Sequence, residues 1–342
     1  FEKRRLKNFF VGGDPMLGFY VHVPFCHGKC PYCDFYSLPD SQEDMDAYVQ
    51  AVLASLDPWM NKLRDRELAT VYFGGGTPSL LGANRLHTIL QGVWERFSLA
   101  PTAEITLEAN PTHVDGAFFQ QVRQAGFNRL SMGLQSANQE ELRFLGRAHS
   151  PQDAAQAVEN ARRAGFKNIS LDLMLGLPGG SQEKLGHSIH FAAGLGVEHI
   201  SSYLLKVEPG TPFAARKVTV PDDDQSAEEY LFAVAELAKL GYAQYEISNF
   251  SRPDRESRHN LLYWRGEEYL GFGPGAHSFF EGRRFYYPRD LAGFLQGNPP
   301  VEDGPGGDFG EFAMVNLRPT RGLRREDCLA KFGKTGEAEF DQ

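Results

Sequence analysis

The sequence predicts an α/β fold built from six consecutive strand–helix units. Short apolar and β-branched runs alternate with stretches of helical pattern from about residue 19 to 240. Glycine ends helices well because it adopts the left-handed conformation, and a glycine closes four of the predicted helices: Gly126, Gly165, Gly196 and Gly241. Strands that alternate with helices predict parallel pairing, which fits both an open six-stranded sheet and a full eight-stranded barrel.

The units follow one another in a regular order. The predicted strands cover residues 19–23, 70–73, 104–108, 129–135, 168–175 and 200–207. The predicted helices cover residues 43–57, 84–97, 115–125, 152–164, 182–195 and 224–240. Barrel enzymes place their sites at the carboxyl ends of the strands. Glu108, Gln135 and Asp172 lie on or at the ends of predicted strands, so they are candidate site residues.

The pattern changes after residue 240 and predicts a division of the chain. An N-terminal extension (1–18) precedes the strand–helix region (19–240), and residues 241–297 form an extension that covers it. A Pro-, Gly- and Asp-rich linker is expected over 298–310. Residues 311–342 are interpreted as the start of a small helical C-terminal domain.

Composition limits the classes of partner. The 342 residues carry a net charge of −9, which argues against nucleic acid or an anionic membrane as the main partner. No apolar run reaches the ~20 residues of a membrane span, although peripheral membrane contact stays open. No signal peptide is predicted, and four cysteines suit a reducing compartment, so a cytoplasmic location is expected.

Three of the four cysteines, Cys26, Cys30 and Cys33, follow the first predicted strand with the spacing CxxxCxxC. Three thiolates on one loop can bind three irons of a 4Fe–4S cluster and leave the fourth iron open. Cys328 is an alternative fourth ligand near the other end of the chain. A structural zinc site completed by His22 or His27 is a second alternative. A disulfide with a spare thiol is less favoured, since nothing else suggests secretion.

This cysteine spacing, followed by aromatic residues, resembles the radical S-adenosylmethionine (SAM) superfamily. The resemblance favours a partial (β/α)6 barrel over the alternatives. It implies that SAM chelates the open iron and that the reduced cluster cleaves SAM to a 5′-deoxyadenosyl radical. The run Gly74–Gly76 resembles the element of that superfamily whose backbone binds the amino group of SAM.

A larger set of residues resembles the oxygen-independent coproporphyrinogen III oxidase family. By that resemblance, Tyr20 and Tyr32 flank the cluster and the adenine region. The first SAM would be contacted by Gly75, Gly76, Thr77 and Glu108. Gln135, Arg147 and Asp172 would contact that SAM or a second one.

Two features favour the heme-chaperone branch of that family. Phe35 stands where the oxidase has a fourth cysteine, and residues 259–264 match the HNxxYW motif. The resemblance implies that His259 and Trp264 contact heme, and that heme passes to acceptor proteins. An electron donor such as ferredoxin or flavodoxin is expected. The four histidines interpreted as structural are His22, His27, His149 and His277.

Two alternatives stay open at this point: an oxygen-independent coproporphyrinogen III dehydrogenase and a two-SAM radical methyltransferase. Phe35 and the HNxxYW motif argue against the first, and the second has no evident need for His259. Whether SAM cleavage accompanies heme delivery does not follow from the sequence.

Overall fold

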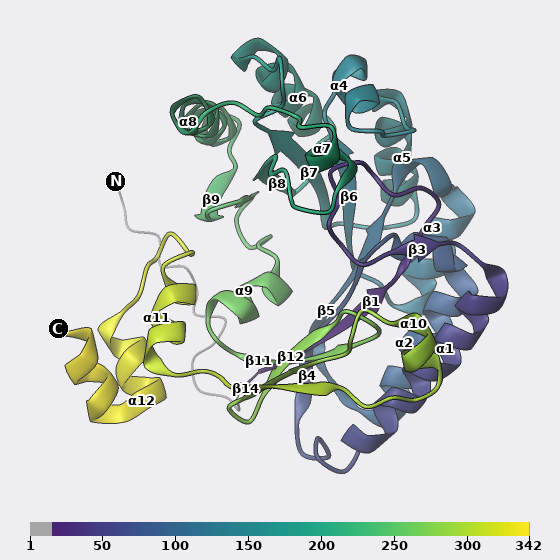
Figure 1. Cartoon of the computed structure of the whole chain (residues 1–342), viewed down its shortest axis with the longest axis vertical. Coiled ribbons are helices and arrows are strands. Elements are labelled where there is room, and N and C mark those ends of the chain that lie inside the picture. The colour runs from purple at the N-terminus through teal and green to yellow at the C-terminus, as the bar shows by residue number, and fades with distance from the viewer. Residues whose placement is uncertain (1–15, 342) are drawn as a thin grey trace.

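One large β-sheet organises the protein. The structure, a computed structural model, describes residues 16–341, so most of the predicted extension 1–18 lies outside the described residues. Twelve strands form the sheet in the order β14-β13-β12-β11-β1-β4-β5-β6-β7-β8-β10-β9. Within the described residues, β14 and β9 end the sheet without pairing with each other, so it curves as a partial barrel (Figure 1).

Six parallel strands at the centre of this sheet confirm the predicted strand–helix units. Each pairs in parallel with the next. They are β1 (Leu17–Val23), β4 (Glu67–Gly75), β5 (Ser98–Ala109), β6 (Arg129–Gln135), β7 (Ile169–Leu175) and β8 (His199–Leu204).

The main helices that follow these strands in the chain lie on the convex face of the sheet (Figure 1). They are α1 (Gln42–Leu56), α2 (Gly82–Arg96), α3 (Gly116–Ala125), α5 (Pro151–Arg163), α6 (Gln182–Gly194) and α8 (Asp223–Lys239). The predicted terminating glycines have positive φ angles: 112° at Gly126, 93° at Gly165, 70° at Gly196 and 84° at Gly241. The helix–strand boundaries were therefore visible in the sequence.

Side-chain alternation separates an apolar core from a polar interior. In β1, Phe19 and Val21 are buried on the side that faces the outer helices, and Phe19 contacts the rings of Phe97 and Phe272. Successive side chains of a strand point to opposite faces, so Tyr20 and His22 point to the concave side. The same alternation in the neighbouring strands gives the barrel a polar interior.

The sheet continues beyond the predicted units on both sides. On one side β11 (Glu268–Phe272) pairs in parallel with β1, and three antiparallel strands follow: β12 (His277–Phe280), β13 (Arg283–Tyr286) and β14 (Val301–Pro305). On the other side lie β10 (Asn249–Ser251) and β9 (Ala243–Glu246). The predicted linker 298–310 therefore contains a strand. Proline and glycine are tolerated in β14 because it is an edge strand.

Short elements occupy the remaining loops. They are β2 (Phe25–Cys26), β3 (Leu38–Pro39), the 3₁₀ turns η1 (Asp57–Trp59), η2 (Pro78–Leu81) and η3 (Pro111–His113), and the helices α4 (Gln139–Phe144), α7 (Pro212–Ala215), α9 (Arg258–Trp264), α10 (Leu291–Leu295), α11 (Phe309–Asn316) and α12 (Arg325–Phe340). Helix α9 lies on the concave side of the sheet, and the helices α11 and α12 fall within the C-terminal part of the chain (Figure 1). Among residues 16–341, no helix has the length and apolarity to cross a bilayer.

Candidate functional site

The cysteine loop, residues 26–36, follows β1 and is fixed by contacts with other strand ends. Thr77 Oγ1, which follows β4, lies 3.5 Å from Cys26 Sγ. The Arg147 guanidinium donates to Cys30 Sγ at 3.6 Å, and Phe213 N donates to Pro31 O at 3.0 Å. The three thiols are thus held over the carboxyl ends of the parallel strands, where the sequence predicted the site.

The glycine run Gly74–Gly76 lets the cysteine loop pack against β4. Gly76 N donates to Val23 O at 2.8 Å, and Thr77 N donates to Phe25 O at 2.7 Å. A Cβ atom on Gly76 would lie 2.6 Å from Phe25 O. The need for glycine here therefore comes from the protein's own backbone. The predicted contact of Gly75, Gly76 and Thr77 with SAM stays a prediction.

The three thiols fit a cluster in their chemistry. All are free and partly exposed. Burial raises the pKa of Cys33, and the nearby Cys30 and Cys26 raise it further, so the sulfur atoms are close neighbours. Among residues 16–341, no group of three or more His, Cys, Asp and Glu side chains is arranged around one metal ion. A 4Fe–4S cluster needs no such convergence, because each thiolate binds its own iron.

A row of polar side chains crosses the concave face beneath the cysteine loop. Tyr20 on β1 is followed by Tyr72 on β4, whose hydroxyl donates to Glu108 Oε1 at 2.7 Å. Asp172 on β7 lies close enough to Glu108 for its charge to raise the pKa of Glu108, and Asp172 accepts from Ser131 at 3.3 Å. The structure brings Tyr20, Glu108 and Asp172 together, and their predicted contacts with the cluster region and SAM stay predictions.

Gln135 and Arg147 form the part of the site next to the cysteine loop. Gln135 has a φ of 67°, and Ser136 N donates to Leu134 O across it, which makes a tight γ-turn at the end of β6. The Arg147 guanidinium donates to Gly133 O at 2.9 Å. Its Nε is buried without a hydrogen-bond partner among residues 16–341, so the Arg147 side chain keeps one N–H donor available for a ligand.

Tyr32 points from the cysteine loop toward the ends of β7 and β8. It packs against a small apolar cluster, and its ring lies 6.2 Å from Phe213. Burial raises its pKa, as does the neighbouring Cys30 thiol. Tyr32 therefore lies next to the cysteines, and its predicted place beside the cluster stays a prediction.

His259 of α9 is buried beside this row of polar side chains. Its ring is buried, at 1% exposure, with Nδ1 2.7 Å from Thr70 Oγ1 and Nε2 2.7 Å from Tyr263 OH. The ring stacks on Tyr72 at 5.0 Å. Burial, and then the charge of Arg129, lowers the pKa of His259 to about 3. In this conformation His259 supports the polar row and offers no free ring nitrogen, so its predicted contact with heme is untested.

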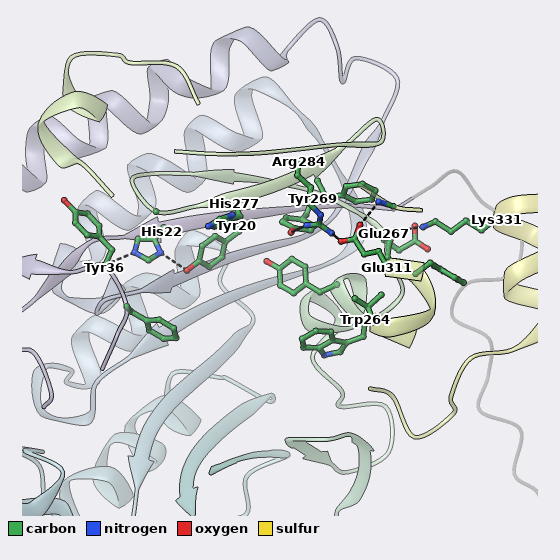
Figure 2. A pocket seen from close by; sticks show the side chains of 18 of the residues that line it. Tyr20, His22, Tyr36, Trp264, Glu267, Tyr269, His277, Arg284, Glu311 and Lys331 are labelled. Carbon is green, nitrogen blue, oxygen red and sulfur yellow. Dashed lines mark hydrogen bonds and ion pairs between the residues drawn. The ribbon is translucent and has the colours of Figure 1, made fainter. Parts of the chain in front are cut away.

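An open pocket of about 420 Å³ lies beside the cysteine loop, between the strands β11–β13 and the helices α9, α11 and α12 (Figure 2). We call it the aromatic pocket. Its lining includes the aromatic side chains Tyr20, Phe35, Tyr36, Tyr263, Trp264, Tyr269, Phe279 and Phe312, the cations Arg284, Arg289 and Lys331, and the imidazoles His22 and His277. The volume is within the range of small-molecule sites, ~300–1,000 Å³. Trp264 lines this pocket, and its buried Nε1 has no hydrogen-bond partner in the described part of the chain; its predicted contact with heme stays a prediction.

Comparison with known proteins agrees with this geometry. A model of the radical SAM superfamily matches residues 20–192. The heme chaperone HemW of Mycobacterium tuberculosis is 43% identical over 295 residues, which cover 83% of this chain and 75% of that protein. This chain belongs to the HemW family of radical SAM proteins. HemW of Escherichia coli is 43% identical over 289 residues, covering 83% of this chain and 76% of that one.

A second relative and one solved structure extend the comparison. HemW of Bacillus subtilis is 38% identical over 340 residues, or 95% of this chain and 89% of the relative. The coproporphyrinogen III oxidase HemN of Escherichia coli superposes with a TM-score of 0.80 over 96% of this chain and 79% of that chain. At 24% identity that likeness concerns the fold. A 4Fe–4S cluster and SAM are the cofactors that membership of the radical SAM family implies.

Several residues of the HemW-family site were not predicted. Tyr72 links Tyr20 to Glu108, and Tyr263 links His259 to the aromatic pocket. Both were accessible to pattern analysis, since Tyr72 alternates with Thr70 and Gly74, and Tyr263 follows His259 by one helical turn. Arg129 is 2% exposed and stands near Glu104 and Tyr72, but nothing in the sequence marked it.

Glu108 gives this HemW-family protein a pH-dependent stability. Burial raises the pKa of Glu108 to about 7, and the Asp172 charge adds to this, while the hydrogen bond from Tyr72 opposes it. Between pH ~4.5 and ~7, Glu108 is therefore protonated in the folded state but ionised in the unfolded state. As the pH rises from ~4.5 to ~7, ionisation of Glu108 should lower the free energy of unfolding by on the order of 3 kcal/mol.

The Glu108→Gln variant tests this. Gln keeps an oxygen that accepts from Tyr72 but does not titrate. We expect the variant to be more stable than the parent at pH 8 and about equal at pH 5, as measured by denaturant unfolding under anaerobic conditions. Two curves that stay parallel across this pH range would contradict the pKa of Glu108.

The γ-turn at Gln135 predicts that relieving its backbone strain will stabilise the protein and weaken ligand binding. A residue other than glycine in the left-handed region costs ~1–3 kcal/mol, and such strain collects at functional sites. Gln135→Gly should raise the unfolding free energy by ~1 kcal/mol and weaken SAM binding. Lys217→Gly is the matched control, since Lys217 is exposed with a φ of 51°. The control should gain stability with SAM affinity unchanged; equal SAM affinity in both variants would contradict the role of Gln135.

Proposed function

We propose that this protein is a heme chaperone that holds a 4Fe–4S cluster and SAM, binds heme in the aromatic pocket and delivers it to acceptor proteins. The observation that carries the proposal is the position of the pocket. Its lining includes Phe35 and Tyr36 of the cysteine loop as well as Tyr263 and Trp264 of the HNxxYW helix. Relatives that share 38–43% of their residues with this chain are named heme chaperones.

The pocket has the chemistry that a heme needs. A porphyrin is flat and apolar with two carboxylates at one edge, and aromatic rings suit its faces. Arg289 and Lys331 line the same pocket and supply cations for the carboxylates, whereas Arg284, which also lines it, is ion-paired with Glu311. Lys331 also lies 5.0 Å from the Phe312 ring, so the cationic and aromatic parts of the pocket adjoin.

The interior residues have separate tasks in the proposed SAM site. Bound together, the cluster and SAM supply one-electron chemistry. Cys26, Cys30 and Cys33 would hold the cluster, and Glu108 and Asp172 would face the cationic part of SAM. The close pair of carboxylates favours a bound cation, because a positive charge relieves their mutual repulsion. Arg147 already donates to Cys30 Sγ, so it would lie between the cluster and SAM and donate a hydrogen bond to the SAM carboxylate.

Phe35 separates this proposal from an oxidase function. Phe35 is 62% exposed and lines the aromatic pocket beside the cysteines. It places a large apolar ring where the oxidase family has a thiol. We infer that this face of the cysteine loop contacts the porphyrin and does not take part in decarboxylation.

The remaining parts of the proposal concern partners and location. We infer that one or more heme-acceptor proteins receive the cofactor, and that a ferredoxin or flavodoxin reduces the cluster in the cytoplasm. The acidic net charge of −9 makes nucleic acid an unsuitable partner.

A paired anaerobic assay tests the proposed function. The cluster-loaded protein is incubated with coproporphyrinogen III, SAM and a reductant, and in parallel the heme-loaded protein is mixed with an apo heme protein. We expect no protoporphyrinogen, and appearance of the acceptor's own heme spectrum. Turnover of coproporphyrinogen III would support the dehydrogenase alternative and sink the chaperone proposal.

A further inference from the structure

Heme bound by a chaperone needs a ligand for its iron, and histidine is the usual protein ligand. A candidate must have a ring nitrogen without a hydrogen bond, and it must reach the cavity. The histidines near the aromatic pocket differ sharply in both respects. This inference rests on the proposed function, because it concerns how the same pocket holds heme.

Two of the three nearby histidines are fully engaged. His259 has both ring nitrogens hydrogen-bonded, to Thr70 and Tyr263, and it does not line the pocket. His22 lines the pocket but is only 6% exposed. Its Nδ1 lies 3.0 Å from Tyr20 OH, and its Nε2 lies 3.0 Å from Tyr36 O. Either histidine would have to break buried hydrogen bonds before it could bind iron.

His277 differs from both. It begins β12, is exposed and lines the pocket near Tyr20 (Figure 2). Within residues 16–341, neither of its ring nitrogens has a hydrogen-bond partner. Its ring stacks on Tyr286 at a centroid distance of 5.2 Å and an angle of 22°. The imidazole is therefore oriented while its nitrogens remain available.

The backbone around His277 is tightly defined. A Cβ atom on Gly271 would lie 2.3 Å from His277 O, so the turn between β11 and β12 fits closely against the following strand. His277 and Tyr286 are also partners in the β12–β13 register. A ligand held on a paired strand is positioned more precisely than one on a loop.

The charges and rings near His277 complement a heme. Asp303, Arg289 and Arg284 are all near enough to influence its charge, and both arginines line the pocket, where Arg284 is ion-paired with Glu311. Phe35, from the cysteine loop, lines the same cavity with an exposed ring. An available imidazole, two guanidinium groups and an aromatic wall therefore meet at one end of the pocket.

We propose that His277 supplies the imidazole that binds the heme iron in the aromatic pocket. His259 is then a positioning residue, which acts through Tyr263 on the shape of the pocket wall. The sequence had favoured His259 as the heme contact and His277 as structural, and the free and engaged ring nitrogens reverse that preference.

Heme titration of single variants tests this assignment. Cluster-loaded protein is titrated anaerobically with hemin, and the Soret band is recorded as a difference from the same protein without heme. The variants are His277→Ala, His277→Gln, His259→Ala and His22→Gln. The control is His187→Ala, an exposed histidine on α6 outside the pocket. Circular dichroism checks that each variant is folded.

We expect both His277 variants to lose the histidine-type Soret band and to bind hemin at least tenfold more weakly. Added free imidazole should restore the parent band in His277→Ala. His259→Ala, His22→Gln and His187→Ala should keep the band position. If His277→Ala keeps the parent spectrum and affinity, the assignment is wrong while the proposed function stands. If the parent protein itself binds no hemin, the proposed function fails instead.

Discussion

Replacing Cys26, Cys30 and Cys33 together with alanine will reduce the iron content of the reconstituted protein from about four atoms per chain to none. These thiols are the cysteines of the loop that Thr77 and Arg147 fix. Sulfide should fall in parallel, from about four per chain. The measurement is iron and sulfide analysis after anaerobic reconstitution, with the near-ultraviolet and visible spectrum as a second readout.

Cys328→Ala is the matched control for this experiment. Cys328 is buried in α12, within the C-terminal helices, whereas the three loop cysteines are partly exposed. We expect the control to keep its full iron content. Loss of the cluster in Cys328→Ala would show that a fourth cysteine closes the cluster, and the open iron site would then be wrong.

SAM will alter the EPR spectrum of the reduced cluster, and the carboxylate variants Glu108→Ala and Asp172→Ala will weaken that response. Both side chains face the barrel interior, and hydrogen bonds to charged groups contribute ~1.5–3 kcal/mol. The SAM concentration for half-maximal change should therefore rise by about 10- to 100-fold. A SAM titration of the dithionite-reduced protein measures this directly.

Glu228→Ala provides the control, since Glu228 is an exposed carboxylate on α8. It removes a carboxylate as Glu108→Ala does, but it should leave the SAM response unchanged. A cluster whose spectrum ignores saturating SAM in the parent protein would contradict an open iron site and would favour a structural cluster.

The central sheet was predictable because each unit carries its own local signals. Glycines at helix ends and the alternation within strands need no distant partner to be recognised. The flanking strands lacked such signals. β11 pairs with β1, which is remote in the sequence, and β14 forms from Pro- and Gly-rich residues because β13 offers it an edge. Pairing of this kind depends on the folded sheet and not on the local sequence.

The positions of the three loop cysteines and of the interior carboxylates were also predictable, because their spacing and their places at strand ends are local properties; their roles as cluster and SAM ligands stay predictions. Whether each histidine has its ring nitrogens hydrogen-bonded or free could not be predicted from the sequence. His259 bonds to Thr70, which lies 189 residues earlier, and its ring is engaged by Tyr263 as well. His277 gave no local sign that its nitrogens stay available. Which imidazole is free is set by three-dimensional contacts between distant segments.

Anaerobic titration of the cluster-loaded, SAM-saturated protein with hemin tests the proposed chaperone function most directly. A heme chaperone should show a saturable Soret band with a stoichiometry of about one heme per chain, and Trp264→Ala should weaken that binding because the indole lines the pocket. Absorbance that rises linearly with hemin and never saturates would contradict a specific heme site in the aromatic pocket.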